Sequence, residues 1–176
     1  MEAKELMEKS VRFHGHICPG LAIGVIAAKY VLDQGYNFSP NEELVAVVEN
    51  DNCSVDAIQV LLGTTFGKGN LVHNDFGKFN YYFYDRRTTK AVRLVLKKID
   101  FGDKKLTRDE RIQLILSSKP EDIFNLYEID FNPPGLARIE ESVPCEICGE
   151  LVMNSRVLTY NNSEMCISCY RKMREK

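Results

Sequence analysis

Two histidines and a cysteine stand within five residues of one another in the segment FHGHICPG, residues 13–20. Imidazole nitrogens and thiolate sulfurs are ligands that zinc prefers, and the same groups serve nucleophilic catalysis. The whole chain has three histidines and six cysteines, so this density favours a chemical role over the packing of Cys18 as a small apolar side chain. His14, His16 and Cys18 are therefore the first candidates for a metal or thiol site.

Cys18 is expected at the N-terminus of a helix. Pro19 biases the residue before it toward extended backbone and suits the first position of a helix. The residues that follow, LAIGVIAAKYVL, carry no strong breaker and are apolar almost all round, which predicts a buried helix to about residue 34. The free N–H groups and the dipole at the start of that helix favour a thiolate at Cys18.

A second cysteine, Cys53, has the same kind of placement. LVAVVE, residues 44–49, has the continuous hydrophobicity of a buried strand, and a helix is expected from about residue 54 to 62. Cys53 then lies at the strand-to-helix junction, with Asp56 in the first helical turn, where it would orient a histidine or take a proton. A buried structural cysteine is the alternative for Cys53 alone. The candidate catalytic residues are Cys18, His16, Cys53 and Asp56, and the candidate metal ligands at this site are His14, His16, Cys18 and Cys53.

The other four cysteines form two CxxC pairs near the C-terminus, separated by 17 residues. This spacing is a strong signal for a tetrahedral zinc site, and four thiolate ligands make such a site closed and structural. A redox-active pair is disfavoured because two pairs are present without a thioredoxin-like context. We expect a treble-clef-like finger with a knuckle, a hairpin around residues 152–159 and a ligand-bearing helix. Its ligands are Cys145, Cys148, Cys166 and Cys169.

The remaining elements predict an α+β fold, with N-terminal helices packed on a mostly antiparallel sheet and a small C-terminal zinc-finger domain. Three strands are expected to form an antiparallel meander, and two helices to follow them, the second over EDIFNLYEI. The segment FNPPG is the clearest break in the chain. The expected strands are 71–73, 79–84 and 91–96, and the expected domains are 1–130 and 144–176, joined by a linker over 131–143.

Composition narrows the class of protein. A net charge of −2 gives no electrostatic footprint for bulk nucleic-acid binding. No apolar run reaches the roughly 18 residues that a membrane span needs, and the N-terminal MEAKELMEKS lacks the apolar region of a secretory signal. Paired cysteines with metal-ligand spacing favour a reduced, cytoplasmic protein over a disulfide-bonded secreted one.

Three segments in order resemble the FmdE family, named after the FmdE subunit of formylmethanofuran dehydrogenase: FHGHICPGLAIG, VENDNCSVDAIQVLLGTTFGKGNL and the strands ending in AVRLVL. The resemblance covers about residues 5–130. It implies an α+β core, a homodimer, and in many members a C-terminal zinc finger. It also implies a polar pocket built by His14, His16, Cys18, Asp51, Cys53 and Asp56. Many members have a cysteine in the loop after the second helix, where this chain has Thr64 and Thr65.

The resemblance implies a role beside an oxidoreductase. Formylmethanofuran dehydrogenase reduces CO2 with a pterin-bound metal and iron–sulfur clusters, but this chain has no ferredoxin-like cysteine run and is too short for a large pterin domain. We therefore expect a metal-binding accessory protein of one-carbon, methanogenic, or molybdenum and tungsten enzyme metabolism. It would carry a structural Zn²⁺ in the finger and a second metal, with Zn²⁺ a candidate, in the N-terminal pocket. The alternative is a zinc-finger regulatory or interaction protein with no catalysis of its own.

Overall fold

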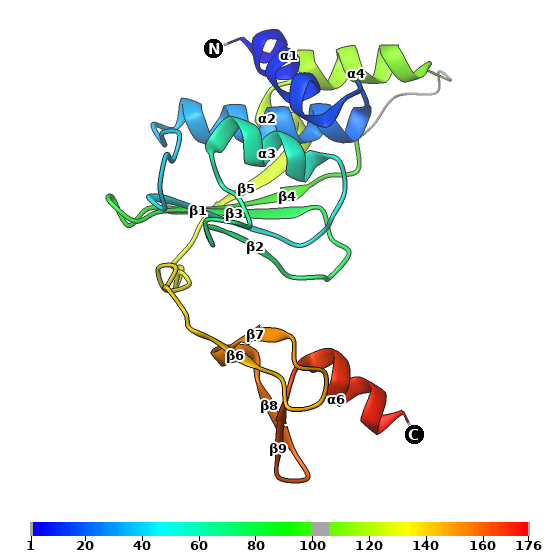
Figure 1. Cartoon of the computed structure of the whole chain (residues 1–176). Coiled ribbons are helices and arrows are strands. Elements are labelled where there is room, and N and C mark those ends of the chain that lie inside the picture. The colour runs from blue at the N-terminus through cyan, green and yellow to red at the C-terminus, as the bar shows by residue number, and fades with distance from the viewer. Residues whose placement is uncertain (1, 100–105, 176) are drawn as a thin grey trace. The chain divides into compact units, whose positions relative to one another are not determined.

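A computed structural model describes residues 2–99 and 106–175 of the chain. The chain divides into two compact units, one that ends at Ala137 and one that begins at Arg138. The first unit packs helices on one face of a five-stranded sheet, and the second is a small cysteine-rich module (Figure 1). The fold is α+β, as the sequence predicts. No helix within the described ranges is both long enough and apolar enough to cross a bilayer.

In the first unit, α2 is the central helix and packs against α1, α3 and α4. Most of its side chains are buried, which explains why its sequence is apolar nearly all round and not on a single stripe. The helix α4 begins with a capping box between Thr107 and Glu110, which satisfies N–H groups at the start of the helix. The helices are α1 (Ala3–His14), α2 (Pro19–Asp33), α3 (Ser54–Leu62), α4 (Arg108–Ser117) and α5 (Pro120–Ile123).

The sheet has the strand order β2-β1-β3-β4-β5. All five residues of β1 are buried, in agreement with the predicted continuous strand. One side of the sheet contributes the apolar core beneath the helices, where Tyr81, Phe83 and Phe124 are the largest fully buried side chains of the strands. The strands are β1 (Leu44–Val48), β2 (Leu71–His73), β3 (Asn80–Asp85), β4 (Ala91–Leu96) and β5 (Phe124–Glu128).

Two expectations about this sheet were wrong. β2 does not start the meander; it pairs in parallel with β1, so that β1, α3 and β2 form a β-α-β unit, and the antiparallel meander is β3-β4-β5. The segment EDIFNLYEI is not one helix, because α5 stops at Ile123 and β5 follows. Phe124 and Leu126 pack against the core while Asn125 is exposed, which is the two-residue period of a strand.

The expected linker belongs partly to the first unit, which extends to Ala137 and does not end at residue 130. The Arg86 guanidinium donates to the carbonyl oxygen of Pro134 over 2.7 Å, and the Ala137 N–H donates to the Glu42 carboxylate over 2.9 Å. The Phe131 ring lies 5.8 Å from the Tyr84 ring, centroid to centroid. These contacts hold the chain after β5 against the sheet.

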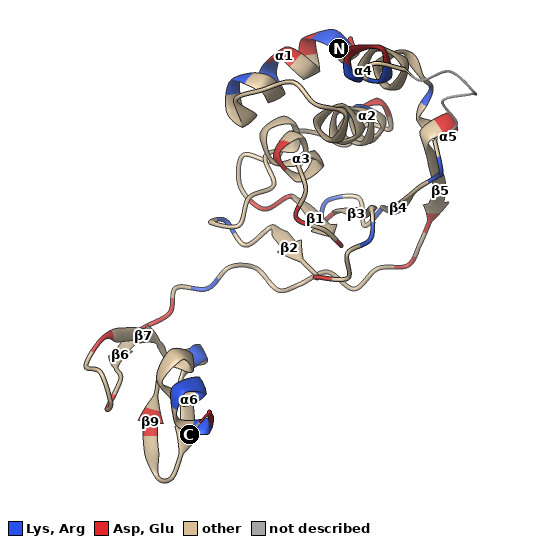
Figure 2. Cartoon of the chain, turned by 90° about the vertical axis from the view of Figure 1, so that its right-hand side faces the viewer, with Lys and Arg blue, Asp and Glu red and all other residues tan. Residues whose placement is uncertain are grey.

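The second unit consists of two short hairpins and a terminal helix. The first hairpin pairs β6 (Ser142–Pro144) with β7 (Leu151–Met153), and the second pairs β8 (Leu158–Tyr160) with β9 (Ser163–Met165). The expected hairpin around residues 152–159 is therefore wrong, because β7 and β8 belong to different sheets and a 3₁₀ turn, η1 (Asn154–Arg156), separates them. The charged residues of α6 (Ile167–Arg174) are all Lys or Arg, whereas α1 contains charged residues of both signs (Figure 2).

Candidate metal centre

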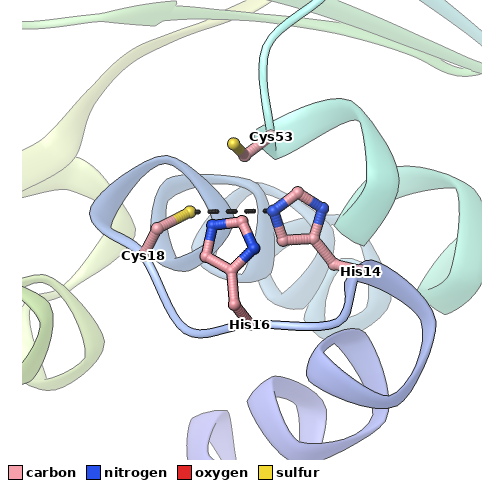
Figure 3. A group of neighbouring side chains, drawn as sticks. All are labelled: His14, His16, Cys18 and Cys53. Atoms are coloured by element: carbon pink, nitrogen blue, oxygen red, sulfur yellow. Dashed lines mark hydrogen bonds between the residues drawn. The ribbon is translucent and has the colours of Figure 1, made fainter.

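Four side chains from the first unit meet at one point. The ligand atoms of His14, His16, Cys18 and Cys53 all lie within 4.8 Å of one another. His14 ends α1, His16 lies in the following loop, Cys18 precedes α2 and Cys53 precedes α3. Figure 3 shows the two rings and the two sulfur atoms gathered around a common centre. The structure thus brings together all four residues that the sequence proposed as metal ligands here.

Cys18 occupies the predicted place at the start of α2. Its backbone is extended, with φ −153° and ψ 160°, and Pro19 is the first helical residue. The Cys18 sulfur accepts a hydrogen bond from the Leu21 N–H over 3.3 Å, so it acts as the helix N-cap. Only 7% of the residue is exposed. The local sequence therefore fixes this sulfur at a partly positive helix end.

Two glycines of α2 let the start of α3 come close enough for Cys53 to join the group. A Cβ atom at Gly24 would lie 2.2 Å from the Ser54 carbonyl oxygen, which no side chain tolerates. A Cβ atom at Gly20 would lie 3.3 Å from the Cβ of Cys53. The sequence reasoning missed these positions, although two glycines four residues apart share one helix face and signal a close approach.

His14 is oriented by the acidic residue of α3. Its Nδ1 atom lies 2.7 Å from the Oδ2 atom of Asp56, and its Nε2 atom lies 4.0 Å from the Cys18 sulfur. Because a carboxylate only accepts, Nδ1 carries the proton and Nε2 is free to bind a metal ion. The His14 and His16 rings are 4.4 Å apart, centroid to centroid. Asp56 therefore has the orienting role that the sequence proposed for it.

The donor set fits a divalent metal such as zinc. Burial and the neighbouring Cys18 thiol raise the pKa of Cys53, so this residue does not favour its thiolate form on its own. A bound cation would supply the charge that stabilises the thiolate. Two sulfur and two nitrogen donors are a common tetrahedral zinc set. His16 is exposed, so the centre meets solvent on the side of that ring.

Of the family-implied pocket residues, Asp51 and Asp56 are not members of this group of four. Asp56 contacts His14, whereas Asp51 is exposed. The backbone N–H of Asn52 bonds to the Asn50 side chain, and Asn52 in turn accepts from the Ser54 N–H and hydroxyl. These local bonds shape the junction that positions Cys53.

The second unit has its own cysteine centre. The sulfur atoms of its four cysteines lie within 4.8 Å of one another, as the CxxC spacing predicts. The Cys145 sulfur accepts the Cys166 N–H over 3.3 Å, and the N–H groups of Cys166 and Cys148 lower the pKa of Cys145 to about 6. The cluster is consistent with a zinc finger. Its residues are Cys145, Cys148, Cys166 and Cys169.

Comparison with known proteins agrees with this picture. The model of a protein family described as "FmdE, Molybdenum formylmethanofuran dehydrogenase operon" matches residues 13–125, more than half of the chain. A protein of Archaeoglobus fulgidus, named a probable S-adenosyl-L-methionine-binding protein, is 28% identical over 194 aligned positions, which cover 93% of this chain and 52% of that protein. The chain thus spans about half the length of that curated relative.

A solved structure is similar over nearly the whole chain. It is the crystal structure of a protein from Syntrophus aciditrophicus that is described as like FmdE of tungsten formylmethanofuran dehydrogenase, with a TM-score of 0.71 and 27% sequence identity. The match covers 96% of this chain and 91% of that one, so it includes both units. The segment matched by the family model holds all four residues of the N-terminal centre. The chain belongs to the FmdE family.

Proposed function

We propose that this FmdE-family protein is a cytoplasmic, metal-dependent accessory protein of molybdenum or tungsten enzymes in one-carbon metabolism. The observation that carries the proposal is the convergence of four donor atoms within 4.8 Å from three separate elements. The family description and the name of the Syntrophus relative support the enzymatic context. None of the six cysteines forms a disulfide, which suits a reducing compartment.

The residues of the centre would have different roles. His14, Cys18 and Cys53 would hold the ion, since they are buried or half-buried and are fixed by helix ends. The ion would act as a Lewis acid toward a bound water or substrate. His16, on the exposed loop, would be the donor that a substrate displaces or the group that moves a proton. Asp56 would keep the proton on His14 Nδ1.

Metal analysis tests the assignment of the centre. Purified wild-type protein is expected to hold two metal ions per chain, one in each cysteine centre. Cys18→Ser should retain one ion per chain, in the finger. Asp51→Asn is the matched control, because Asp51 is exposed near α3 and lies outside the group, and it should retain two. Two ions in Cys18→Ser would contradict the assignment.

The accessory role needs a test in cells. In a host that produces both proteins, loss of this chain should lower formylmethanofuran dehydrogenase activity, or the activity of another molybdenum or tungsten enzyme. The wild-type chain should restore the activity and the Cys18→Ser chain should not. Unchanged activity of all these enzymes without the chain would contradict the role, and would favour an interaction protein with no catalysis.

We also propose a homodimer, supported by the family membership. Light scattering across micromolar concentrations should give about twice the 20.1 kDa of one chain. A constant monomer mass over that range would contradict the proposal. Measuring the apo and the metal-loaded protein side by side shows whether the mass depends on metal content.

A further inference from the structure

A cavity of about 530 Å³ lies on the first unit, between strands of the sheet and the chain that follows β5. Its walls come from β1, β2 and β3, from the turn after β2, and from residues 131–134. None of its lining residues is a metal-ligand candidate. The residues on which the argument rests are Glu49, Phe76, Tyr82, Phe131 and Pro134.

The chain that closes this cavity is held in place by specific contacts. Arg86 donates to the Pro134 carbonyl oxygen over 2.7 Å, and the Phe131 ring packs on the rings of Tyr82 and Tyr84 at 6.2 and 5.8 Å. The Ala137 N–H is bonded to Glu42 at the far end of the same segment. Contacts of these kinds make the wall part of the folded unit and give the cavity a defined shape.

The charged residue among those that line the cavity is Glu49, whose carboxylate is buried. Glu49 is 5% exposed, and it accepts hydrogen bonds from the Asn80 amide over 2.6 Å and from the Tyr82 hydroxyl over 3.0 Å. Within residues 2–99 and 106–175 it forms no ion pair. A buried carboxylate without a cationic partner is costly, and two accepted bonds leave lone pairs for further donors.

The Tyr82 hydroxyl is a donor to Glu49. Burial, together with the Glu49 carboxylate, raises the pKa of Tyr82, so its hydroxyl stays protonated and donates. Arg93 contacts the same hydroxyl, to which its Nε donates over 2.9 Å. Two cations of the protein already lie near rings at the cavity: the Arg93 guanidinium is 5.3 Å from the Tyr82 ring centre and the Lys78 ammonium 5.9 Å from that of Phe76. The selection of a ligand cation therefore rests on Glu49 and not on these rings.

We propose that this cavity binds an organic ammonium ion with an aromatic or apolar body. The N–H groups of the ligand would donate to the free lone pairs of Glu49, and its body would contact the rings of Phe76, Tyr82 and Phe131. Charge complementarity at Glu49 selects the ligand: a buried carboxylate beside aromatic rings favours a cation over a neutral or anionic molecule of the same shape. This site is independent of the metal centre and goes beyond the proposed function.

The test is a titration of the full chain with benzylamine, which is a cation at pH 7, followed by the shifts of backbone amide NMR signals. Wild-type protein should bind it saturably, and neutral benzyl alcohol should bind at least about tenfold more weakly. The Glu49→Gln variant should bind benzylamine more weakly than wild type by about the same factor. Glu128→Gln is the matched control, because Glu128 is exposed on β5 and lines no part of this cavity, and it should bind as wild type.

A second variant keeps the test decisive if Glu49→Gln fails to fold. Phe76 is 61% exposed, so Phe76→Ala leaves the core intact, and it should weaken benzylamine binding by at least about threefold. Three results would each overturn the proposal: no saturable binding of benzylamine to wild type, equal affinity for benzyl alcohol, or wild-type affinity in folded Glu49→Gln. Metal content of the samples should be the same throughout, which separates this site from the metal centre.

Discussion

The Oδ2 atom of Asp56 lies 2.7 Å from Nδ1 of His14, across two helices that are distant in sequence. The contact directs the other ring nitrogen of His14 toward the sulfur of Cys18, 4.0 Å away. The His14 side chain is 11% exposed and that of Asp56 is 36% exposed, so the pair stands at the edge of the core. An acidic residue in this position orients a ligand and raises its basicity toward a metal ion.

This relationship predicts the effect of Asp56→Asn. An amide oxygen accepts a weaker hydrogen bond from the Nδ1–H group than a carboxylate does. His14 therefore loses its fixed orientation, and the N-terminal centre should bind Zn²⁺ roughly 10–100-fold more weakly. A competition titration against a chromophoric chelator measures this affinity. Asp51→Asn controls for the loss of a nearby negative charge and should leave it unchanged. Equal affinity in Asp56→Asn and wild type would show that the contact has no role in binding.

Gly24→Ala tests the packing that brings Cys53 into the centre. The new Cβ atom would lie 2.2 Å from the Ser54 carbonyl oxygen, so α2 and α3 must move apart. We expect a loss of about 1–3 kcal/mol in the free energy of unfolding, together with weaker metal binding in the N-terminal centre. Gly67→Ala is the control, since a Cβ atom there meets nothing within 4 Å. Thermal unfolding in the presence of a chelator measures the change in stability separately from the change in metal binding. A variant as stable as wild type would contradict this account.

The finger should depend on its metal ion. Its buried cluster is small, with Met165 the only fully apolar buried side chain beside the cysteines among the described residues, so apolar burial alone cannot stabilise it. Cys166→Ser should release one ion per chain and unfold residues 138–175 while the first unit keeps its structure. Amide NMR spectra resolve the two units separately. A folded finger in this variant, or unchanged metal content, would refute the assignment.

The pKa of Glu43 predicts how the stability of the first unit changes at acidic pH. Hydrogen bonds from its own backbone N–H and from the Ser39 hydroxyl lower the pKa of Glu43 to about 2. The folded-state pKa is below the ordinary value of 4.5, so its stabilising contribution is present above that value and is lost as the pH falls toward 2. Urea unfolding from about pH 6 down to the folded-state pKa should show this decline in wild type and a smaller one in Glu43→Gln. An equal decline in the stability of wild type and Glu43→Gln would contradict the prediction.

Local signals in the sequence predicted much of the N-terminal centre. Pro19 placed Cys18 at the start of a helix, and the strand-like run before Asn52 placed Cys53 at a junction, both as the structure has them. The approach of α3 to α2 depends on Gly20 and Gly24, whose neighbours Cys53 and Ser54 lie far along the chain. Contacts of that kind are not visible in a local pattern.

The errors in the fold have the same origin. Leu71–His73 has three residues, and its partner strand is β1 rather than the next strand along the chain, because α3 makes the crossover between them. The change from α5 to β5 falls inside a short apolar and acidic segment, where Phe124 and Leu126 fit either a helix or a strand. In both cases tertiary pairing decided between local alternatives.

The central claim is that His14, His16, Cys18 and Cys53 hold one metal ion. X-ray absorption spectroscopy of the metal in Cys166→Ser tests it most directly, because that variant has lost the ion of the finger. The account predicts one ion per chain with two sulfur ligands at about 2.3 Å and two nitrogen ligands at about 2.0–2.1 Å. A variant without bound metal, or a first shell without both sulfur and nitrogen, would contradict it.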